Sequence, residues 1–310
     1  MDIELSTTQA VKDSYLTIAG YQTDSDTPNV HTGTGFIKRR APFVTHHTCE
    51  YISKLFVDLF NSEHYLVNNV NIDIELSPNE TVFNLIAKDN NVYRFQLISC
   101  KLYVKSLYLM DGLNLELAAK LELEPARYSL QRTEMSSLQI AQGLQQFSAN
   151  LFHDQVPRSI IIAFVRYNSF IGLVTSSPFT FEPFDIKDIN IQVSGHRYPN
   201  IPYSNLDFPN NIFARPFHDM QDNLGFLNST ESNGIKMEEY KNYKCFFTFN
   251  LTISQENDGC HDLIRTGTTS VVVTFSTAVP AGGIQMIVYG SHDSLLLCDS
   301  NRVISSDMTV

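Results

Sequence analysis

The chain of 310 residues has no tryptophan, few charged side chains and no long apolar run. Charged residues make up 18% and apolar residues 43%, so the chain can bury a sizeable core and lacks the composition of a disordered protein. No stretch of about 18 apolar residues occurs, so we expect no insertion into a membrane. Residues 1–15 lack the charged-then-apolar pattern of a secretion signal, and we therefore expect synthesis inside the cell without secretion.

Positive charge is also scarce. The net charge is −11 and the isoelectric point is near 5.2, which argues against a surface that neutralises nucleic-acid phosphates along its length. The exception is the short basic run Lys38-Arg39-Arg40. Tyr103 and Lys105 interleave aromatic and basic character, but a nucleic-acid platform needs more positive charge around them.

Motifs for metal binding are missing as well. His46, His47 and Cys49 lie close together, but no second ligand pair with metal-binding spacing accompanies them. The cysteines are odd in number and show no CxxC spacing, so we expect reduced thiols and no zinc site. The five cysteines are Cys49, Cys100, Cys245, Cys260 and Cys298.

Catalytic and cofactor motifs are equally absent. Gly33-Thr-Gly35 lacks the third glycine and the strand-to-helix context of a phosphate-binding loop. Asn168-Ser169 has the composition of a turn, and nothing marks Ser169 as an activated nucleophile. We therefore expect no catalytic, cofactor-binding or metal site, and a protein that is not an enzyme.

What the sequence does contain is β-strand alternation. Apolar residues recur at every second position, with polar residues between them, in several segments separated by turn residues. One stretch, residues 113–124, predicts a helix, and a shorter helix is expected near residues 236–240. Strands without regular helical crossovers indicate a sandwich or a barrel. The alternation is clearest in residues 70–76, 98–105, 189–193 and 247–253.

Two passages repeat at a constant offset. Val156-Pro157 and Val279-Pro280 each open an apolar strand that ends in a polar pair, and they lie about 120 residues apart. Residues 70–74 and 189–193 repeat with nearly the same offset. That period fits one eight-stranded sandwich, so the repetition predicts two similar β domains in tandem.

Four passages resemble the major capsid protein of Polinton (Maverick) elements and of related adintovirus-type viruses. The resemblance spans roughly residues 33–304, and its motifs are structural, with no catalytic content. One departure is Ser177, where asparagine is expected before the proline. The passages are GTGFIKRRAPF, KLFVDLFNSEHYLVNNVNIDIELSP, VPRSIIIAFVRYNSFIGLVTSSPFTF and IVYGSHDSLLLCDSNRVI.

The resemblance implies an all-β fold of two tandem eight-stranded jelly rolls with a few short helices in loops. We expect residues 1–35 to form an N-terminal arm, 36–172 the first roll, and 173–310 the second roll with a short C-terminal tail. Such subunits form homotrimers, pseudo-hexagonal capsomers that tile an icosahedral virion shell beside a single jelly-roll protein at the vertices. Lys38-Arg39-Arg40 and the arm are candidates for weak genome contact.

Two other classes are compatible with an all-β chain. A tandem β-sandwich lectin or adhesin would bind carbohydrate through its loops. Such proteins are usually secreted, however, and neither a signal nor a disulfide framework is visible here. A jelly-roll enzyme of the cupin type would show a histidine-rich metal motif, which this sequence lacks.

Overall fold

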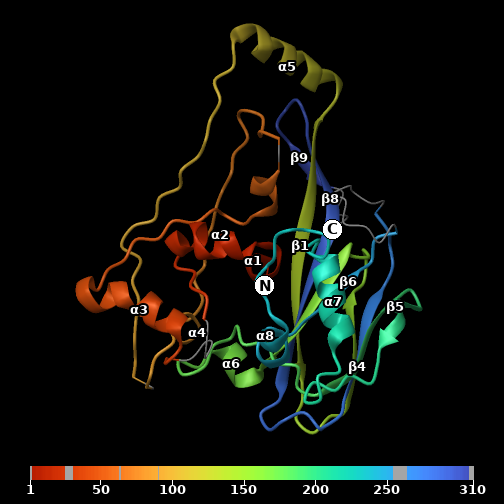
Figure 1. Ribbon diagram of the computed structural model, residues 1–310. Coiled ribbons are helices and arrows are strands. Elements are labelled where there is room, and N and C mark those ends of the chain that lie inside the picture. Colours follow the sequence, from red (N-terminus) through yellow and green to blue (C-terminus); the bar gives the residue numbers. More distant parts are fainter. Residues whose placement is uncertain (1, 25–30, 63, 90, 254–263, 307–310) are drawn as a thin grey trace.

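The computed structural model describes residues 2–24, 31–62, 64–89, 91–253 and 264–306. Two antiparallel sheets carry the core (Figure 1). One has the order β1-β8-β3-β6, with β9 beside β8, and the other has the order β2-β7-β4-β5. The strands are β1 (Ala126–Ile140), β2 (Gln146–Phe152), β3 (Ser159–Arg166), β4 (Ile186–Val193), β5 (His196–Tyr203), β6 (Phe246–Asn250), β7 (Thr269–Phe275), β8 (Ile284–Cys298) and β9 (Ile304–Ser306).

This strand order is that of a jelly roll. The chain crosses from sheet to sheet at almost every connection, so that β1 and β8, the first and last of the eight main strands, lie side by side. Short helices occupy the loops and the N-terminal part. The all-β class, the jelly-roll topology and the presence of short helices, as expected from the sequence, are confirmed.

The expected domain division needs correction. Ser159 of β3 pairs with Asn250 of β6 and with Ser291 of β8, so strands on either side of residues 172–173 share one sheet. The two repeated passages are β3 and β8 themselves, neighbouring buried strands with similar requirements. The described strands from Ala126 to Cys298 form one jelly roll, and a second roll remains a prediction.

The helices lie mainly outside the two sheets. Residues 113–124 were expected to be helical, and all of them except Glu124 fall within α5, while α8 overlaps the helix expected near residues 236–240. The helices are α1 (Asp2–Ser6), α2 (Gln9–Asp13), α3 (Thr34–His46), α4 (Thr81–Asn84), α5 (Asp111–Leu123), α6 (Tyr167–Ile171), α7 (Ala214–Asn223) and α8 (Met237–Asn242), with 3₁₀ turns η1 (Tyr15–Ala19) and η2 (Asp58–Asn61).

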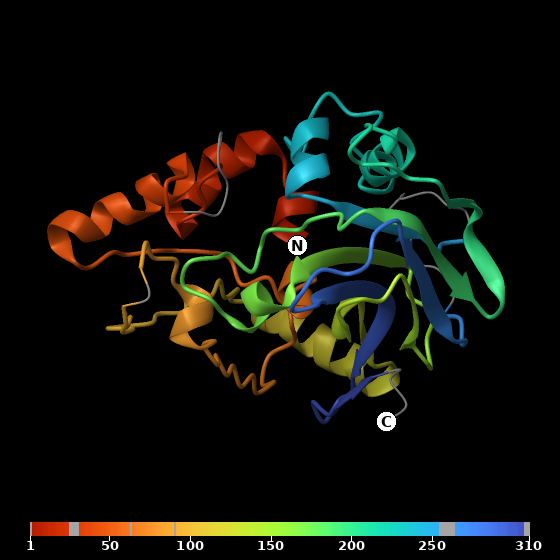
Figure 2. The same ribbon diagram turned by 90° about the horizontal axis from the view of Figure 1, so that it is seen from below.

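The N-terminal region is folded onto the body instead of extending as an arm. Leu5 and Leu16 are buried, and Leu5 belongs to the main hydrophobic core. Figure 2 shows the red N-terminal helix next to the cyan helix α8. Burying these leucines offsets the entropy lost in ordering the segment.

Two predicted strands have no place in either sheet. Residues 70–76 and 98–105 are extended in the structure but pair with none of the described strands. Conversely, β2 and β5 lie outside the segments in which the alternation was clearest. Local alternation identifies a strand, whereas pairing depends on partners far along the chain.

The core lies between the sheets. In β7 buried residues alternate with half-buried ones, as in a strand with one covered face. In β3, by contrast, six consecutive residues are buried, because helices and loops cover its second face. β3 is therefore the central strand of the molecule.

The passage after β3 joins the two sheets. The Phe181 side chain is buried, and its ring centroid lies 4.9 Å from that of Phe246. Phe179 is instead 55% exposed, and its ring meets the Phe83 ring edge-on, with 5.9 Å between centroids. Arg166 holds the passage in place by donating two hydrogen bonds of 2.8 Å to the Glu182 carboxylate.

Replacing the two phenylalanines separately should give different results. Phe181→Ala leaves a cavity in the core and should lower the free energy of unfolding by about 3–5 kcal/mol. Phe179→Ala, the matched control, should lower it by less than about 1 kcal/mol, because its ring is mostly in solvent. Urea denaturation followed by circular dichroism measures both, and equal losses would contradict this assignment.

Candidate functional site

The first buried polar cluster fastens the N-terminal helices to the body. The Glu4 carboxylate lies 2.6 Å from the ammonium group of Lys244, and the Tyr21 hydroxyl donates to Glu4 Oε2 at 2.7 Å. Lys12 is almost completely buried, and its ammonium donates to the carbonyls of Glu4 at 2.6 Å and Asn233 at 2.8 Å. These contacts connect residues 4–21 to residues 233–244.

Electrostatics in this N-terminal cluster follow from burial and mutual pairing. Burial lowers the pKa of Lys12, with the Glu4 carboxylate opposing that shift. The pKa of Glu4 is lowered in spite of its burial, because Lys244 and Lys12 both stabilise its charge. Burial raises the pKa of Tyr21 well above its usual value, and the negative charge of Glu4 adds to that shift. The opposite charges of Glu4 and its two lysine partners offset each other, and their contacts attach the N-terminal helices to the body.

A second polar cluster lies between β1, β3 and β8. Arg158, just before β3, reaches Asp293 of β8 at 3.5 Å, and both side chains are buried. Gln155 donates to the backbone carbonyl of Asp293 at 2.9 Å. The proline–arginine pair at the start of the strand therefore has a structural role, since Arg158 connects the entry of β3 to its neighbour β8.

His292 is the unusual member of this second cluster. Its side chain is only 1% exposed, and its ring meets the ring of Phe152 edge-on, with 5.1 Å between centroids. Neither ring nitrogen has a hydrogen-bond partner among the described residues. Burial lowers the pKa of His292 from 6.5 to about 4, and the charge of Arg132 adds to that shift, although Glu134 and Asp293 oppose it. At neutral pH the imidazole is uncharged.

The serine considered as a nucleophile has a structural environment. Ser169 lies in α6, is buried, and shares a hydrogen bond of 2.7 Å with the Ser176 hydroxyl. That contact closes the turn after β3. Ser169 lies far along the chain from His292, and no described contact connects them.

The glycine-rich turn at Gly33-Thr-Gly35 also has a structural role. Gly33 precedes the first residue of α3, and the Gly35 N–H donates to the Asp24 carboxylate. Asp24 thus occupies the position that a phosphate would take at this helix end. In the basic run, Arg39 lies 3.9 Å from Asp24 and donates to the carbonyl of Gln22, while Lys38 and Arg40 are exposed.

The histidine–cysteine cluster is only partly described. The side chain of His46 lies outside the described residues, and His47 and Cys49 are exposed. Within the described ranges, no group of three or more histidine, cysteine, aspartate or glutamate side chains is arranged to hold a metal ion. Cys49, Cys100, Cys245 and Cys298 are free thiols, and Cys260 lies outside the described residues.

Surfaces, more than clefts, distinguish this chain. Residues 71–80 and 91–120 are exposed without interruption, and they include large apolar side chains such as Ile98 and Val104. The sequence predicted strands here but gave no sign that they would lack a sheet. Among the described helices, none has both the length and the apolar character needed to cross a membrane.

The titration of His292 should make stability depend on pH. Between its usual pKa of 6.5 and the folded-state value of about 4, the unfolded chain binds a proton that the folded chain refuses, so stability falls as pH falls. Between pH 7 and pH 4 the wild type should lose about 3 kcal/mol more unfolding free energy than His292→Leu. Urea titrations at both pH values measure this, and parallel losses would refute it.

No family model matches the chain. It is 30% identical over 301 residues to the uncharacterized protein F54H12.2 of Caenorhabditis elegans, and the match covers 94% of this chain and 70% of that protein.

The solved structures that resemble it include a virus capsid and a major capsid protein. The match to the cryo-electron microscopy structure of the Sputnik virophage has a TM-score of 0.41 at 13% identity and covers 60% of this chain. It covers only 39% of the virophage chain, so this protein spans about two fifths of that neighbour. The mavirus major capsid protein gives 0.33 at 11% identity, covering 60% of this chain and 42% of the mavirus chain. These likenesses are too distant to carry an argument, whereas the nematode match is sufficient: the chain belongs to the family of the uncharacterized protein F54H12.2.

Proposed function

We propose that this protein is a non-enzymatic structural subunit, a major capsid protein of the Polinton type that assembles into homotrimeric capsomers of an icosahedral virion shell. The observation that carries the proposal is the eight-strand order of a jelly roll, in which β1-β8-β3-β6 faces β2-β7-β4-β5. Viral capsid proteins commonly use this architecture.

The motif residues behind the sequence resemblance support the proposal through their contacts. Arg302, in the last passage, donates to the carbonyl oxygen of Asn68 at 2.8 Å and to its side-chain oxygen at 3.0 Å. Asp58, in the second passage, accepts a hydrogen bond of 3.0 Å from the Thr133 N–H. Arg158 and Phe181, in the third passage, join β3 to its surroundings. Residues of the passages that resemble capsid proteins are thus used to hold those passages in place.

A second sandwich is part of the proposal. The described jelly roll begins at Ala126, so we place the second roll before it, with residues 36–125 contributing strands. The alternation of residues 70–76 and 98–105 supports this placement, because such patterns are typical of half-buried strands.

Partners follow from the same proposal. Neighbouring capsomers and a vertex protein with a single jelly roll would surround each trimer. Genome contact would be weak and confined to the exposed Lys38 and Arg40, because Arg39 is engaged with Asp24 and Gln22.

A second candidate is a carbohydrate-binding module. A shallow hollow of about 340 Å³ lies on the sheet β2-β7-β4-β5. Hydroxyl and amide side chains line it, and such groups can bind sugar hydroxyls. The polar lining residues are Ser148, Asn150, Gln192 and Ser270.

Oligomer mass and particle shape distinguish the two functions. We expect light scattering to give a species near three times 35.1 kDa and negative-stain microscopy to show pseudo-hexagonal particles or shells. A dispersed monomer that binds to a glycan array, and loses that binding on Asn150→Ala, would instead establish the lectin function. Asn223→Ala, outside the hollow, serves as the control for glycan binding.

A further inference from the structure

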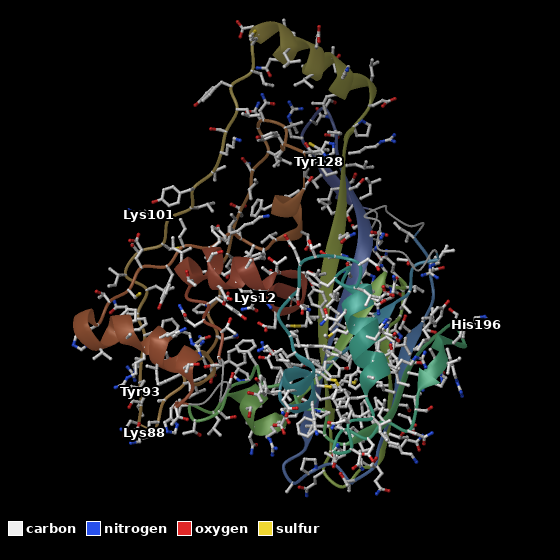
Figure 3. All side chains as sticks on the ribbon, viewed as in Figure 1. Lys12, Lys88, Tyr93, Lys101, Tyr128 and His196 are labelled. Atoms are coloured by element: carbon white, nitrogen blue, oxygen red, sulfur yellow. The ribbon has the colours of Figure 1, made fainter. Side chains whose placement is uncertain are left out.

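A lysine and an asparagine are buried together where the N-terminal helices meet the body. The Lys12 side chain is fully buried, and Figure 3 labels it among the N-terminal helices. Asn233 is completely buried as well. The Lys12 ammonium donates a hydrogen bond of 2.8 Å to the backbone carbonyl of Asn233. Burying an ammonium group costs free energy, so a reaction that removes its charge is favoured at this position.

The Lys12 amine lies beside the side-chain amide of the same asparagine. The backbone carbonyl and the side-chain amide of Asn233 branch from one Cα, so rotation of the flexible Lys12 side chain exchanges a contact with the carbonyl oxygen for one with Cγ. Burial lowers the pKa of Lys12 and thereby favours the neutral amine, which is the nucleophilic form. Lys12 is therefore a desolvated amine held next to an amide carbon.

The amide of Asn233 is held by hydrogen bonds that suit attack on its carbon. The Ile235 N–H donates to Asn233 Oδ1 at 3.1 Å, and the Gln221 side-chain amide donates to the same oxygen at 3.4 Å. Two donors at one carbonyl oxygen stabilise the negative charge that develops there when the carbon is attacked. On the other side of the amide, Nδ2 donates to the Leu5 carbonyl at 3.4 Å. Cγ is thus the electrophile and Nδ2 the leaving group.

A carboxylate next to the lysine supplies the proton acceptor. Glu4 Oε1 lies 3.6 Å from Lys12 Nζ. Because the pKa of Glu4 is lowered by its lysine neighbours, the carboxylate is ionised at neutral pH and can take a proton from the amine. Lys244 lies 2.6 Å from the same oxygen, so Glu4 keeps a charged partner after Lys12 has lost its charge.

We propose that Lys12 and Asn233 form an intramolecular isopeptide bond, with Glu4 as the proton acceptor. Lys12 gives one proton to Glu4, and the neutral amine then attacks Cγ of Asn233. The Nζ–Cγ bond forms, Nζ passes a second proton to Nδ2, and the Cγ–Nδ2 bond breaks. The released ammonia takes the proton from Glu4 and leaves as ammonium. A lysine ammonium and an asparagine amide thus become a secondary amide and an ammonium ion, and neither an oxidant nor a cofactor is needed.

The cross-link makes the attachment of the N-terminal helices permanent. Its two residues lie 221 positions apart in the sequence. Closing a loop of that length lowers the conformational entropy of the unfolded chain and so stabilises the folded one. The bond forms once in each chain without turnover, which agrees with a structural protein, and it forms whether or not the chain assembles with other copies.

Mass spectrometry of the purified full chain tests the bond. The intact mass should fall below the sequence mass by one ammonia molecule. A tryptic digest should contain a branched peptide that joins residues 1–38 to residues 198–236, because cleavage after Lys12 is blocked. Lys12→Met fills the same space without an amine, so it should show the full mass, no branched peptide and a lower urea midpoint. The matched control Lys187→Met, exposed on β4, should keep both the mass deficit and the branched peptide.

The role of Glu4 is tested by the rate of bond formation. After cell-free synthesis, the fraction of branched peptide is followed over time by mass spectrometry. Glu4→Gln should slow its appearance about a hundredfold or more, because the proton acceptor is lost. Glu238→Gln, exposed on α8 and outside the cluster, should leave the rate unchanged. Circular dichroism and melting temperature establish that each variant is folded, and equal rates in the folded variants would overturn the role of Glu4.

Two results would overturn the cross-link itself. The first is a wild type that keeps its full sequence mass and is cleaved by trypsin after Lys12, even after prolonged incubation at neutral pH. The second is a loss of ammonia that persists in Lys12→Met, which would assign the loss to a succinimide formed by the Gly234 nitrogen on the same carbon. Neither result bears on the capsid proposal, which oligomer mass and particle shape test separately.

Discussion

The antiparallel ladder between β1 and β8 is the constraint on which the rest of the structure depends. It runs without a register shift from Ala126 opposite Cys298 to Ile140 opposite Ile284. It brings together two strands that lie far apart in the sequence, and it fixes one edge of the sheet β1-β8-β3-β6. β3 pairs along the other edge of β8, and β6 follows, so the position of β8 sets the order of four strands.

The two buried polar clusters depend on this arrangement. Arg158 and Asp293 can meet only because β3 and β8 are neighbours, and burial of such a pair requires that each charge keep its partner. His292 lies within the ladder, opposite Arg132, and is held neutral between Phe152 and the charged residues. The N-terminal cluster contacts the same core differently: Leu5 packs into it, and Glu4 forms an ion pair with Lys244.

Local features could be predicted from the sequence, whereas long-range pairing could not. The alternation in β4 and the apolar run of β3 identified strands, and the leucine- and alanine-rich stretch identified α5. β2 was not predicted from the sequence because its exposed face is polar. β5 was not predicted because Pro199 and Pro202 are typical of loops. The repetition of β3 in β8 was real, but similar burial in adjacent strands imitates duplication.

The candidate site shows the same division. Sequence patterns argued against a phosphate loop at Gly33 and a nucleophile at Ser169, and in the structure the Gly35 N–H and the Ser169 hydroxyl have internal partners, Asp24 and Ser176. The environment of His292 could not be predicted, because it depends on Phe152 and Arg132 from other strands. The exposure of residues 91–120 is likewise a property of the folded chain.

The β1–β8 ladder also has a consequence for how the protein is made. The ribosome releases Ala126 long before Cys298, so β1 waits with both hydrogen-bonding edges open while the intervening strands emerge. Its sheet can close only after β8 has emerged, and contacts of such large sequence separation form slowly. During that interval a nascent chain is vulnerable to pairing with the wrong strand, which makes it a natural client for chaperones that bind extended segments.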